Sequence, residues 1–436
     1  MNKFAKRLKT KLWNIIDEME KNRYLFVKKG DKDFSRKRKL NFSTMLHMLL
    51  SMGGNTLNKE ILDYFDYNIE TVTSSAFIQQ RSKIQVSALE FLFQEFNNEI
   101  KEKNLYKNCR LVAVDGSDMT YAANPKESDC YFKTSENSKG YNLIHLNAFY
   151  DLLNRTYIDA HIQPKRKSNE HAAFIHMLDR YKSKHKTIFI ADRGYESYNN
   201  FAHVAESGNY YLIRVKDIGS KSIIDNFNLP DSEFDVNIER LITRQQTKEI
   251  KSNPDKYKFL VKSTPFDYLP PGDKDTYKMC FRAVRIKLDD NKYECFITNL
   301  PHESFDIQSL KELYNMRWGI ETSFRELKYA IGLSSFHSKK AEFVQQEIFA
   351  RMIMYNFCEM ITTDVIIKNK PRILTYQANF TMAINICKRF FRQKCQQTLL
   401  DVEALIQKYI LPIRKERRYR IIKKQKSAVS FVYRIS

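Results

Sequence analysis

Two short apolar segments, each followed by an aspartate, constrain the fold of this chain more than any other feature. The segment LVAV at 111–114 leads directly into Asp115, and TIFIA at 187–191 leads directly into Asp192. Continuous apolar runs of this length are typical of strands buried on both faces, as in sheets that helices cover on both sides. Ligand sites in open sheets with parallel strands gather at the strand ends, so both aspartates are candidate functional residues.

The segments around these runs predict an alternation of strands and helices. The first strand is expected to end at Asp115-Gly116-Ser117. Further strands are expected at 143–150, 156–162 and 210–215, and helices at 168–181 and 198–206, with a polar turn at Asn154-Arg155. The predicted order is three strands, helix, strand, helix, strand. This order predicts an α/β fold with a mixed sheet and flanking helices.

The segments on either side have a different character. Residues 1–105 show helical periodicity, whereas residues 218–300 are β-rich, with Pro-Pro-Gly at 270–272 and two strands joined by Asp-Asp-Asn. Within the first region, residues 73–81 begin with good N-cap residues and carry Gln and Arg on a polar face. Both a recognition helix and an ordinary surface helix are consistent with this segment.

The charge balance points to a polyanionic partner. The chain has 73 Lys and Arg against 51 Asp and Glu, a formal net charge of +22. Nucleic acid is the favoured partner, and a solubilising surface or a membrane-surface patch is the alternative. The basic run at 412–426 either follows a DNA backbone or is a solvated tail.

The cysteines and the apolar segments indicate in which cellular compartment the protein is expected. The seven cysteines are scattered without metal-ligand spacing, which argues for reduced thiols and against a zinc site. The N-terminus lacks a signal-peptide core, and no apolar stretch is long enough to span a membrane. We therefore expect a cytoplasmic protein with no membrane partner.

One long helix, begun by an Asp306 cap and running to about Ile331, carries two distinct stripes. The apolar stripe would dock the helix on a sheet and consists of Leu313, Ile320, Phe324, Leu327 and Ile331. A polar stripe about 100° around the helix consists of Tyr314, Arg317, Glu321 and Lys328. Glu321 would then lie at the rim of the buried face, where it can meet carboxylates from the strand ends.

Asp115, Asp192 and Glu321 together form an all-oxygen cluster. Such clusters suit Mg²⁺ or Mn²⁺. Two such ions can flank a phosphodiester, one activating the attacking water or 3′-hydroxyl and the other stabilising the leaving oxygen.

At this point the sequence resembles a known family, the DDE transposases of bacterial insertion sequences, specifically the insertion sequence four family with its Tyr-Arg-Glu-Lys signature. The match is Tyr314-x2-Arg317-x3-Glu321-x6-Lys328 within LYNMRWGIETSFRELK. Asp115 in VAVDGS and Asp192 in IADRGY match the motifs that hold the two family aspartates. The β-rich segment resembles the insertion that interrupts these cores before the last helix.

The resemblance implies a ribonuclease H-like catalytic core in which Asp115, Asp192 and Glu321 bind two Mg²⁺ ions, for which Mn²⁺ can substitute. The implied activity is cleavage of the ends of an insertion sequence and their joining to target DNA. Tyr314, Arg317 and Lys328 are expected to hold DNA phosphates. The implied partners are double-stranded DNA, as inverted-repeat ends and as target, and a second copy of the chain, giving a homodimer on the bacterial nucleoid.

We accordingly divide the chain into five parts. These are a helical DNA-binding region (1–105), the first part of the ribonuclease H-like core (106–217), a β-rich insertion (218–300), the last part of the core (301–365) and a helical, basic C-terminal region (366–436).

Five further residues have a functional and a structural interpretation each. Asp118 is either a spare metal ligand or, as favoured, a turn residue that bonds its own backbone. Arg193 either contacts phosphate or pairs with a carboxylate. For His145, Glu170 and Trp318 we favour a structural histidine, a first-turn helix charge and a packing residue, respectively.

Two other functions remain open from the sequence. A ribonuclease H-like nuclease without strand transfer would use the same carboxylates. A non-catalytic DNA-binding relic of a transposase would have no chemical need for them.

Overall fold

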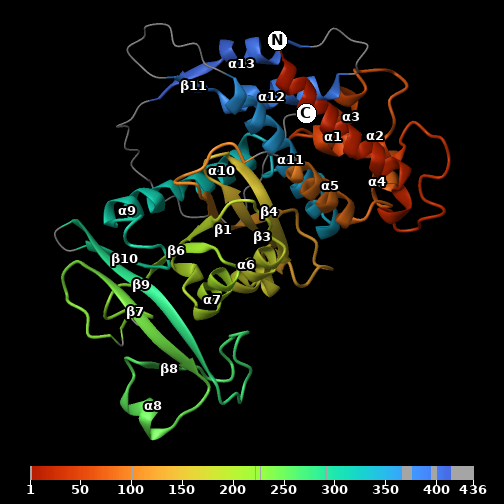
Figure 1. The fold of residues 1–436 in the computed structure, drawn as a ribbon. Coiled ribbons are helices and arrows are strands. Elements are labelled where there is room, and N and C mark those ends of the chain that lie inside the picture. Colours follow the sequence, from red (N-terminus) through yellow and green to blue (C-terminus); the bar gives the residue numbers. More distant parts are fainter. Residues whose placement is uncertain are drawn as a thin grey trace.

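The computed structural model describes residues 2–99, 102–220, 222–225, 227–289, 292–365, 376–393 and 400–413. Within these residues the chain is a mixed α/β protein built on one ten-stranded sheet, with helices on both faces (Figure 1). The basic run predicted at 412–426 lies almost entirely outside the described residues. No described helix is both long enough and apolar enough to cross a membrane.

The central sheet combines an antiparallel meander with parallel strands. β1 (Arg110–Tyr121), β3 (Tyr141–Asp151) and β4 (Thr156–Pro164) are successive antiparallel neighbours, and β5 (Thr187–Ala191) and β6 (Tyr210–Val215) run parallel to β1. The order is β2-β3-β1-β5-β6-β10-β9-β7-β8, with β4 paired to β3. The remaining strands are β2 (Tyr131–Phe132), β7 (Phe234–Thr243), β8 (Tyr257–Phe259), β9 (Thr276–Asp289) and β10 (Lys292–Thr298).

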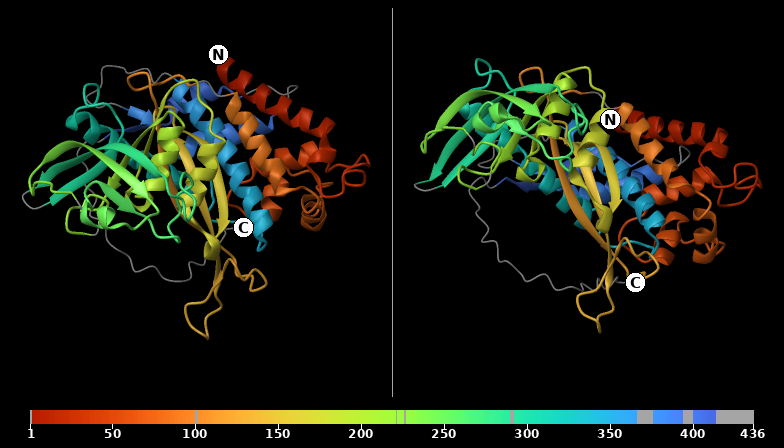
Figure 2. Two further views of the ribbon diagram at one scale, coloured as in Figure 1. Left: turned by 60° about the horizontal axis from the view of Figure 1, so that its bottom comes forward. Right: turned by 90° about the horizontal axis from the view of Figure 1, so that it is seen from below.

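The β-rich segment after residue 217 continues this sheet. β10 pairs antiparallel with β6, and β9 and β7 extend the sheet outward from β10. Figure 2 shows these strands at one end of the molecule and the N-terminal helices at the other. The predicted five-part division of the chain stays a prediction.

β1 extends further than its sequence predicts. We expected it to end at Asp115-Gly116-Ser117, but it continues to Tyr121. Pairing with β5 stops at Val114, whereas pairing with β3 continues to the end of β1, so the antiparallel partner keeps the strand extended. Asp118 therefore lies within a strand, and its interpretation as a turn residue is wrong.

Different sets of helices cover the two faces of the sheet. α6 (Glu170–Asp179) and α7 (Tyr198–Glu206) cover one face, where Phe174 and Phe201 pack with Phe189 of β5 and Tyr211 of β6. On the other face, α10 (Trp318–Tyr329) and α11 (Ala341–Asp364) lie between the sheet and the N-terminal helices. The other helices are α1 (Lys3–Lys21), α2 (Phe42–Ser51), α3 (Leu57–Tyr64), α4 (Ser74–Arg81), α5 (Val86–Asn98), α8 (Lys248–Ser252), α9 (Ile307–Met316), α12 (Phe380–Arg392) and α13 (Val402–Lys408), with short β11 (Tyr376–Ala378) and β12 (Ile410–Pro412).

For α4, the sequence left a recognition helix and a surface helix as alternatives. In the structure, Arg81 on its polar face is buried. Thr73 caps it as expected, accepting a hydrogen bond from Ala76 N. Arg81, however, is only 2% exposed, and it donates hydrogen bonds to Gln346 and Glu347 of α11. Arg81 therefore ties the N-terminal helices to α11, and neither sequence interpretation describes it.

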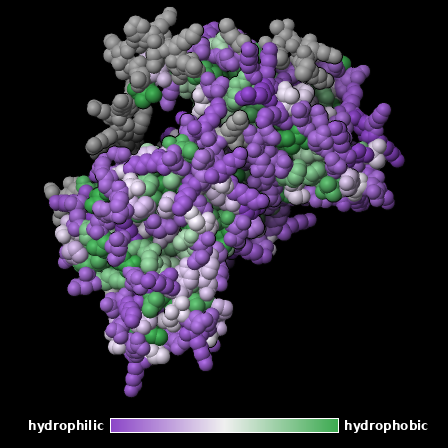
Figure 3. Space-filling view, viewed as in Figure 1, coloured by the Kyte–Doolittle hydropathy of each residue, from purple (hydrophilic) through white to green (hydrophobic). Residues whose placement is uncertain are grey.

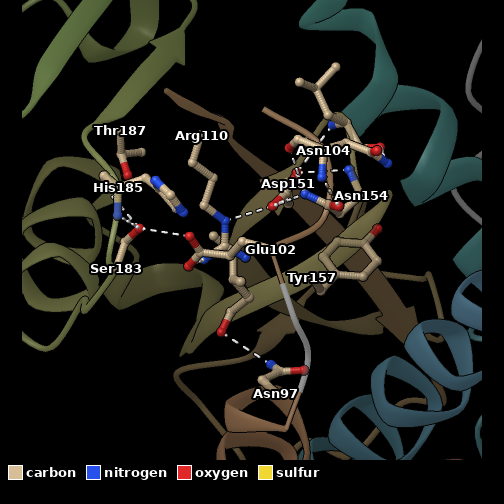
Figure 4. Close-up of polar contacts among 12 residues, drawn as sticks. Asn97, Glu102, Asn104, Arg110, Asp151, Asn154, Tyr157, Ser183, His185 and Thr187 are labelled. Atoms are coloured by element: carbon tan, nitrogen blue, oxygen red, sulfur yellow. Dashed lines mark hydrogen bonds and ion pairs between the residues drawn. The ribbon is translucent and has the colours of Figure 1, made fainter. Parts of the chain in front are cut away.

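A buried polar network fixes the amino end of β1 (Figure 4). Arg110 donates to Asp151 Oδ2 at 2.6 Å and to Glu102 Oε1 at 2.9 Å. Asp151 Oδ1 in turn accepts hydrogen bonds from the backbone N–H groups of Leu153 and Asn154, in the turn between β3 and β4. The network thus holds the register of the first three strands from the end opposite to Asp115.

Hydrophilic side chains cover most of the face of the molecule seen in Figure 3, with small scattered apolar patches. Apolar residues scattered in this way are normal on a folded protein surface.

Candidate active site

The structure places Asp115 and Asp192 next to each other, where the pairing between β1 and β5 stops. β1 and β5 are parallel, and their last paired residues are Val114 and Ala191, so each aspartate immediately follows that pair. Asp115 Oδ1 accepts a hydrogen bond from Gly116 N, and Asp192 Oδ1 accepts one from Gly194 N, both at 2.8 Å. These bonds hold each carboxylate close to its own backbone turn.

Glu321 approaches this edge from α10. The predicted apolar stripe packs as expected, and Ile320, Phe324 and Leu327 are all buried in the core that includes Ala113 of β1. Since Glu321 neighbours this stripe, its partly exposed carboxylate lies at the rim of the helix–sheet contact.

The single long helix predicted from Asp306 to Ile331 is wrong in one respect. Asp306 caps the helix by accepting a hydrogen bond from Ser309 N, but the helix is divided into α9 and α10 at Arg317. Around the break the bonds tighten: Arg317 N donates to Tyr314 O, and Ile320 N donates to Arg317 O. Such i to i+3 bonds are typical of a short 3₁₀ interruption.

Arg317 lies between a carboxylate of α10 and a carboxylate of β1. Its Nη2 donates a hydrogen bond to Glu321 Oε1 at 2.7 Å, and its Nη1 lies 3.9 Å from Asp115 Oδ2. The pKa of Asp115 is raised to about 6, chiefly by burial; the hydrogen bond from Gly116 N and the charge of Arg317 oppose the rise, and the charges of Asp192 and Glu321 contribute to it. Asp115 is therefore close enough to both Asp192 and Glu321 to be affected by their charges.

The two other residues predicted to bind phosphate, Lys328 and Tyr314, differ in how close they lie to the aspartates and in how exposed they are. Lys328 Nζ donates to Ser117 Oγ at 2.7 Å, two residues beyond Asp115. Tyr314 is only 4% exposed and packs its ring against Phe296. Lys328 thus borders the aspartates, while the Tyr314 side chain is mostly covered.

Arg193 and Trp318, two further residues considered in the sequence, are both exposed. Arg193 is exposed next to Asp192 and forms no ion pair among the described residues. Trp318 is 57% exposed, with its ring 5.4 Å from the Arg317 guanidinium. Its interpretation as a packing residue is therefore wrong.

A polar cluster that sequence reasoning missed lies beside the aspartates and is here called the His145 cluster. It consists of Asp118 of β1, His145 of β3, Lys165, and Glu170 in the first turn of α6. His145 is buried, with Nδ1 2.6 Å from Asp118 Oδ1 and Nε2 3.0 Å from Glu170 Oε1. Lys165 Nζ lies 2.8 Å from Asp118 Oδ1. The only sequence signal was that a histidine and an aspartate both lay in or next to strand-like segments.

The electrostatics of the cluster favour its charged form. Burial would raise the pKa of Asp118, but hydrogen bonds from His145 and Lys165 outweigh it and lower this pKa to about 2. Burial likewise lowers the pKa of His145, but Asp118 and Glu170 reverse that effect and raise it. The buried His145 ring therefore has an acidic oxygen within 3.0 Å of each of its nitrogens.

The donor set at the strand ends suits a hard divalent cation, because Asp115, Asp192 and Glu321 offer only oxygen ligands. Among the described residues, however, no group of three or more His, Cys, Asp or Glu side chains is arranged so that it could hold a metal ion. The Arg317–Glu321 hydrogen bond explains part of this, since it directs Glu321 towards a guanidinium.

Comparisons with known proteins identify a family over much of the chain. A family model described as the transposase DDE domain matches residues 109–357, more than half of the chain. No curated protein matches the chain. Among solved structures, one similar chain comes from the cryo-EM structure of the piggyBac transposase synaptic complex with hairpin DNA. It is 10% identical with a TM-score of 0.44, and the match covers 91% of this chain and 83% of that chain.

Proposed function

Because the chain belongs to the transposase DDE domain family, we propose that it cuts the ends of an insertion sequence and joins them to target DNA by phosphodiester hydrolysis and transesterification. The observation that carries this proposal is the meeting of Asp115, Asp192 and Glu321 at one edge of the sheet. The contribution of Asp192 and Glu321 to the raised pKa of Asp115 supports a shared catalytic role.

We further propose that the chain is a member of the insertion sequence four family. The spacing of Tyr314, Arg317, Glu321 and Lys328 supports this. So do the contacts of three of these residues, since Arg317 binds Glu321 and Lys328 binds Ser117 beside Asp115. The four residues would then act together around the scissile bond.

The proposed core is ribonuclease H-like. Two features support it: the antiparallel strands β1, β3 and β4 precede the parallel strands β5 and β6, and the order across the sheet is β4-β3-β1-β5-β6. The carboxylates would be contributed by the central strand β1, by its neighbour β5 and by α10.

Two Mg²⁺ ions, for which Mn²⁺ can substitute, are the proposed cofactors, and Asp115, Asp192 and Glu321 would hold them. When bound, they would supply Lewis acidity to the phosphodiester and activate the attacking oxygen. Ligation by Glu321 requires its side chain to turn away from Arg317. The Arg317 guanidinium is then available for a phosphate oxygen, which it can bind bidentately.

Arg317, Lys328, Tyr314 and Arg193 are the proposed phosphate-binding residues. Lys328 would supply a point charge beside Asp115, and Arg193 would do so beside Asp192. The Tyr314 hydroxyl, mostly covered, would reach DNA only through a small movement of α9. The formal charge of +22 supports long-range attraction of both DNA partners.

The proposed partners are the inverted-repeat ends of the element, the target DNA and a second copy of the chain. A homodimer would allow one active site to act on each of two paired ends. We propose that the protein works in the bacterial cytoplasm, on the nucleoid.

A strand-transfer assay tests this function. Duplex DNA carrying the element's own ends is incubated with the protein, Mg²⁺ and a plasmid target, with a chelator control. Joined products that disappear in chelator are the expected result. Nicked ends without joined products would instead favour a nuclease, and binding without cleavage on the native ends would favour a DNA-binding relic.

A further inference from the structure

Glu170 of the His145 cluster reaches towards both aspartate-bearing turns. A Cβ atom placed on Gly116 would lie 3.3 Å from Glu170 Oε1, and one placed on Gly194 would lie 3.8 Å from Glu170 Oε2. Gly116 follows Asp115, and Gly194 donates its N–H to Asp192. The Glu170 carboxylate therefore lies between the two turns that carry the catalytic aspartates.

A buried hydroxyl at the same place has no hydrogen-bond partner in the described part of the chain. Tyr195 is 1% exposed, and its hydroxyl forms no hydrogen bond with any described residue. Burial raises the pKa of Tyr195, and the charges of Glu170, Asp115 and Asp192 raise it further. The Tyr195 side chain is thus near all three carboxylates. Since buried polar groups are normally hydrogen-bonded, its orphan hydroxyl indicates that something besides protein occupies this point.

Resting on the metal-dependent function proposed above, we propose that Glu170 is a fourth carboxylate of the catalytic centre, and that it holds a divalent cation together with Asp115 and Asp192. His145, 3.0 Å from Oε1, positions the side chain, while Oε2 faces Gly194 and is the ligating oxygen. Among the described residues these side chains are not arranged to hold a metal ion, so the proposed ligation requires them to rotate.

The His145 cluster is built as a positioning device. Its residues come from β1, β3, the segment after β4 and the start of α6, so it links four parts of the core. Asp118 and His145 are directly opposite each other on paired strands, which fixes the imidazole ring. Gly116 leaves space for that ring, because a Cβ there would lie 2.5 Å from His145 Nε2. A helix-end charge alone would need none of these contacts.

Binding of Mn²⁺ to the DNA-free protein, followed by electron paramagnetic resonance of the free ion, tests the proposal. Three variants are compared with the wild type: Glu170→Gln, Asp192→Asn and Glu249→Gln. Glu249 is a matched control, since it is a first-turn acid of α8 in the β-rich segment, away from these carboxylates. Circular dichroism establishes that each variant is folded, and the isosteric Glu170→Gln keeps an oxygen for the contact with His145.

The expected result is a Mn²⁺ affinity about tenfold weaker in Glu170→Gln and at least as much weaker in Asp192→Asn, a change of about 1.4 kcal/mol per tenfold. Glu249→Gln is expected to bind as the wild type does. Weakened binding in Asp192→Asn with unchanged binding in Glu170→Gln would overturn the role of Glu170 and leave the proposed function intact. Unchanged binding in Asp192→Asn would overturn both.

Discussion

Arg317 Nη2 donates a hydrogen bond of 2.7 Å to Glu321 Oε1, one helical turn further along the chain. The other terminal nitrogen of Arg317 lies 3.9 Å from Asp115 Oδ2. One guanidinium therefore bridges the carboxylates of α10 and β1. In the proposed mechanism the same guanidinium later holds a DNA phosphate, so metal and Arg317 compete for Glu321 in the DNA-free protein.

The variant Arg317→Gln is expected to separate metal binding from catalysis. Removal of a positive charge that lies 2.7 Å from Glu321 and 3.9 Å from Asp115 favours the binding of a cation. Charges about 4 Å apart interact by several kcal/mol even at an effective dielectric near 20. We predict Mn²⁺ binding about tenfold tighter, and DNA cleavage at least about 100-fold slower because the phosphate contact is lost. Arg325→Gln, exposed on the same helix, is the control. A weaker Mn²⁺ affinity in Arg317→Gln would contradict this account.

The buried ion pair between α4 and α11 is expected to contribute strongly to stability. Glu347 accepts from Arg81 at 2.9 Å and from Arg351 at 3.0 Å, and all three side chains are buried. Glu347→Gln removes the buried carboxylate charge that both guanidinium groups face, so we predict a loss of about 3–5 kcal/mol in the free energy of unfolding in urea.

The exposed Lys39–Glu70 pair provides the contrast. Glu70→Gln should leave the urea midpoint unchanged, because water and salt screen exposed pairs. Equal effects of Glu347→Gln and Glu70→Gln would show that the buried network does not hold α4 on α11.

A close backbone approach after α10 is expected to make the stability of the protein sensitive to substitution of Gly332. Gly332 has φ +99, and a Cβ there would lie 2.9 Å from Gly54 N in the loop after α2. Gly272 has φ +92 with open space around it. Gly332→Ala combines backbone strain with a backbone clash, whereas Gly272→Ala adds strain alone. We predict that Gly332→Ala destabilises the protein by about 1–3 kcal/mol more than Gly272→Ala, measured by urea unfolding.

His47 is expected to make the helical region sensitive to acid. Its ring is 4.5 Å from that of Trp13 and 5.5 Å from that of Phe391, and burial, assisted by the charge of Lys9, lowers its pKa to about 4. The native state therefore resists protonation of His47. Its contribution to stability is complete above the ordinary pKa of 6.5 and decreases as the pH falls towards 4.

Between pH 7 and pH 4.5 this effect amounts to about 2–3 kcal/mol of unfolding free energy. His47→Phe keeps an aromatic ring without a titrating group, so its unfolding free energy should decrease less over the same pH interval. An identical decrease in wild type and variant would rule out His47 as the cause.

The sequence was informative about those features that depend on neighbouring residues. The apolar runs before Asp115 and Asp192 predicted two buried strands, because such strands need apolar side chains on both faces. The apolar stripe through Ile320 and Leu327 predicted which side of the helix packs on the sheet. Local patterns therefore located the edge of the sheet where the candidate site lies.

Features that depend on distant partners could not be predicted. β1 continues past Asp115 because β3 pairs with it, and no local signal marks that pairing. The polar appearance of Arg81 concealed its burial against Glu347, which is 266 residues away in the sequence. Glu170 lies in the first turn of α6 as predicted, but its contact with His145 could not be predicted, because His145 belongs to another element. Contacts of this kind exist only once the chain has folded.

Cleavage and joining of the element's own DNA ends by wild type, Asp192→Ala and Glu321→Ala in Mg²⁺ is the most direct test of the central claim. DNA binding by each protein is measured in parallel by gel shift in chelator. The account predicts nicked and joined products for the wild type, and loss of both in each variant while DNA binding persists. Unimpaired cleavage in either variant would contradict the assignment of Asp115, Asp192 and Glu321 as the catalytic carboxylates.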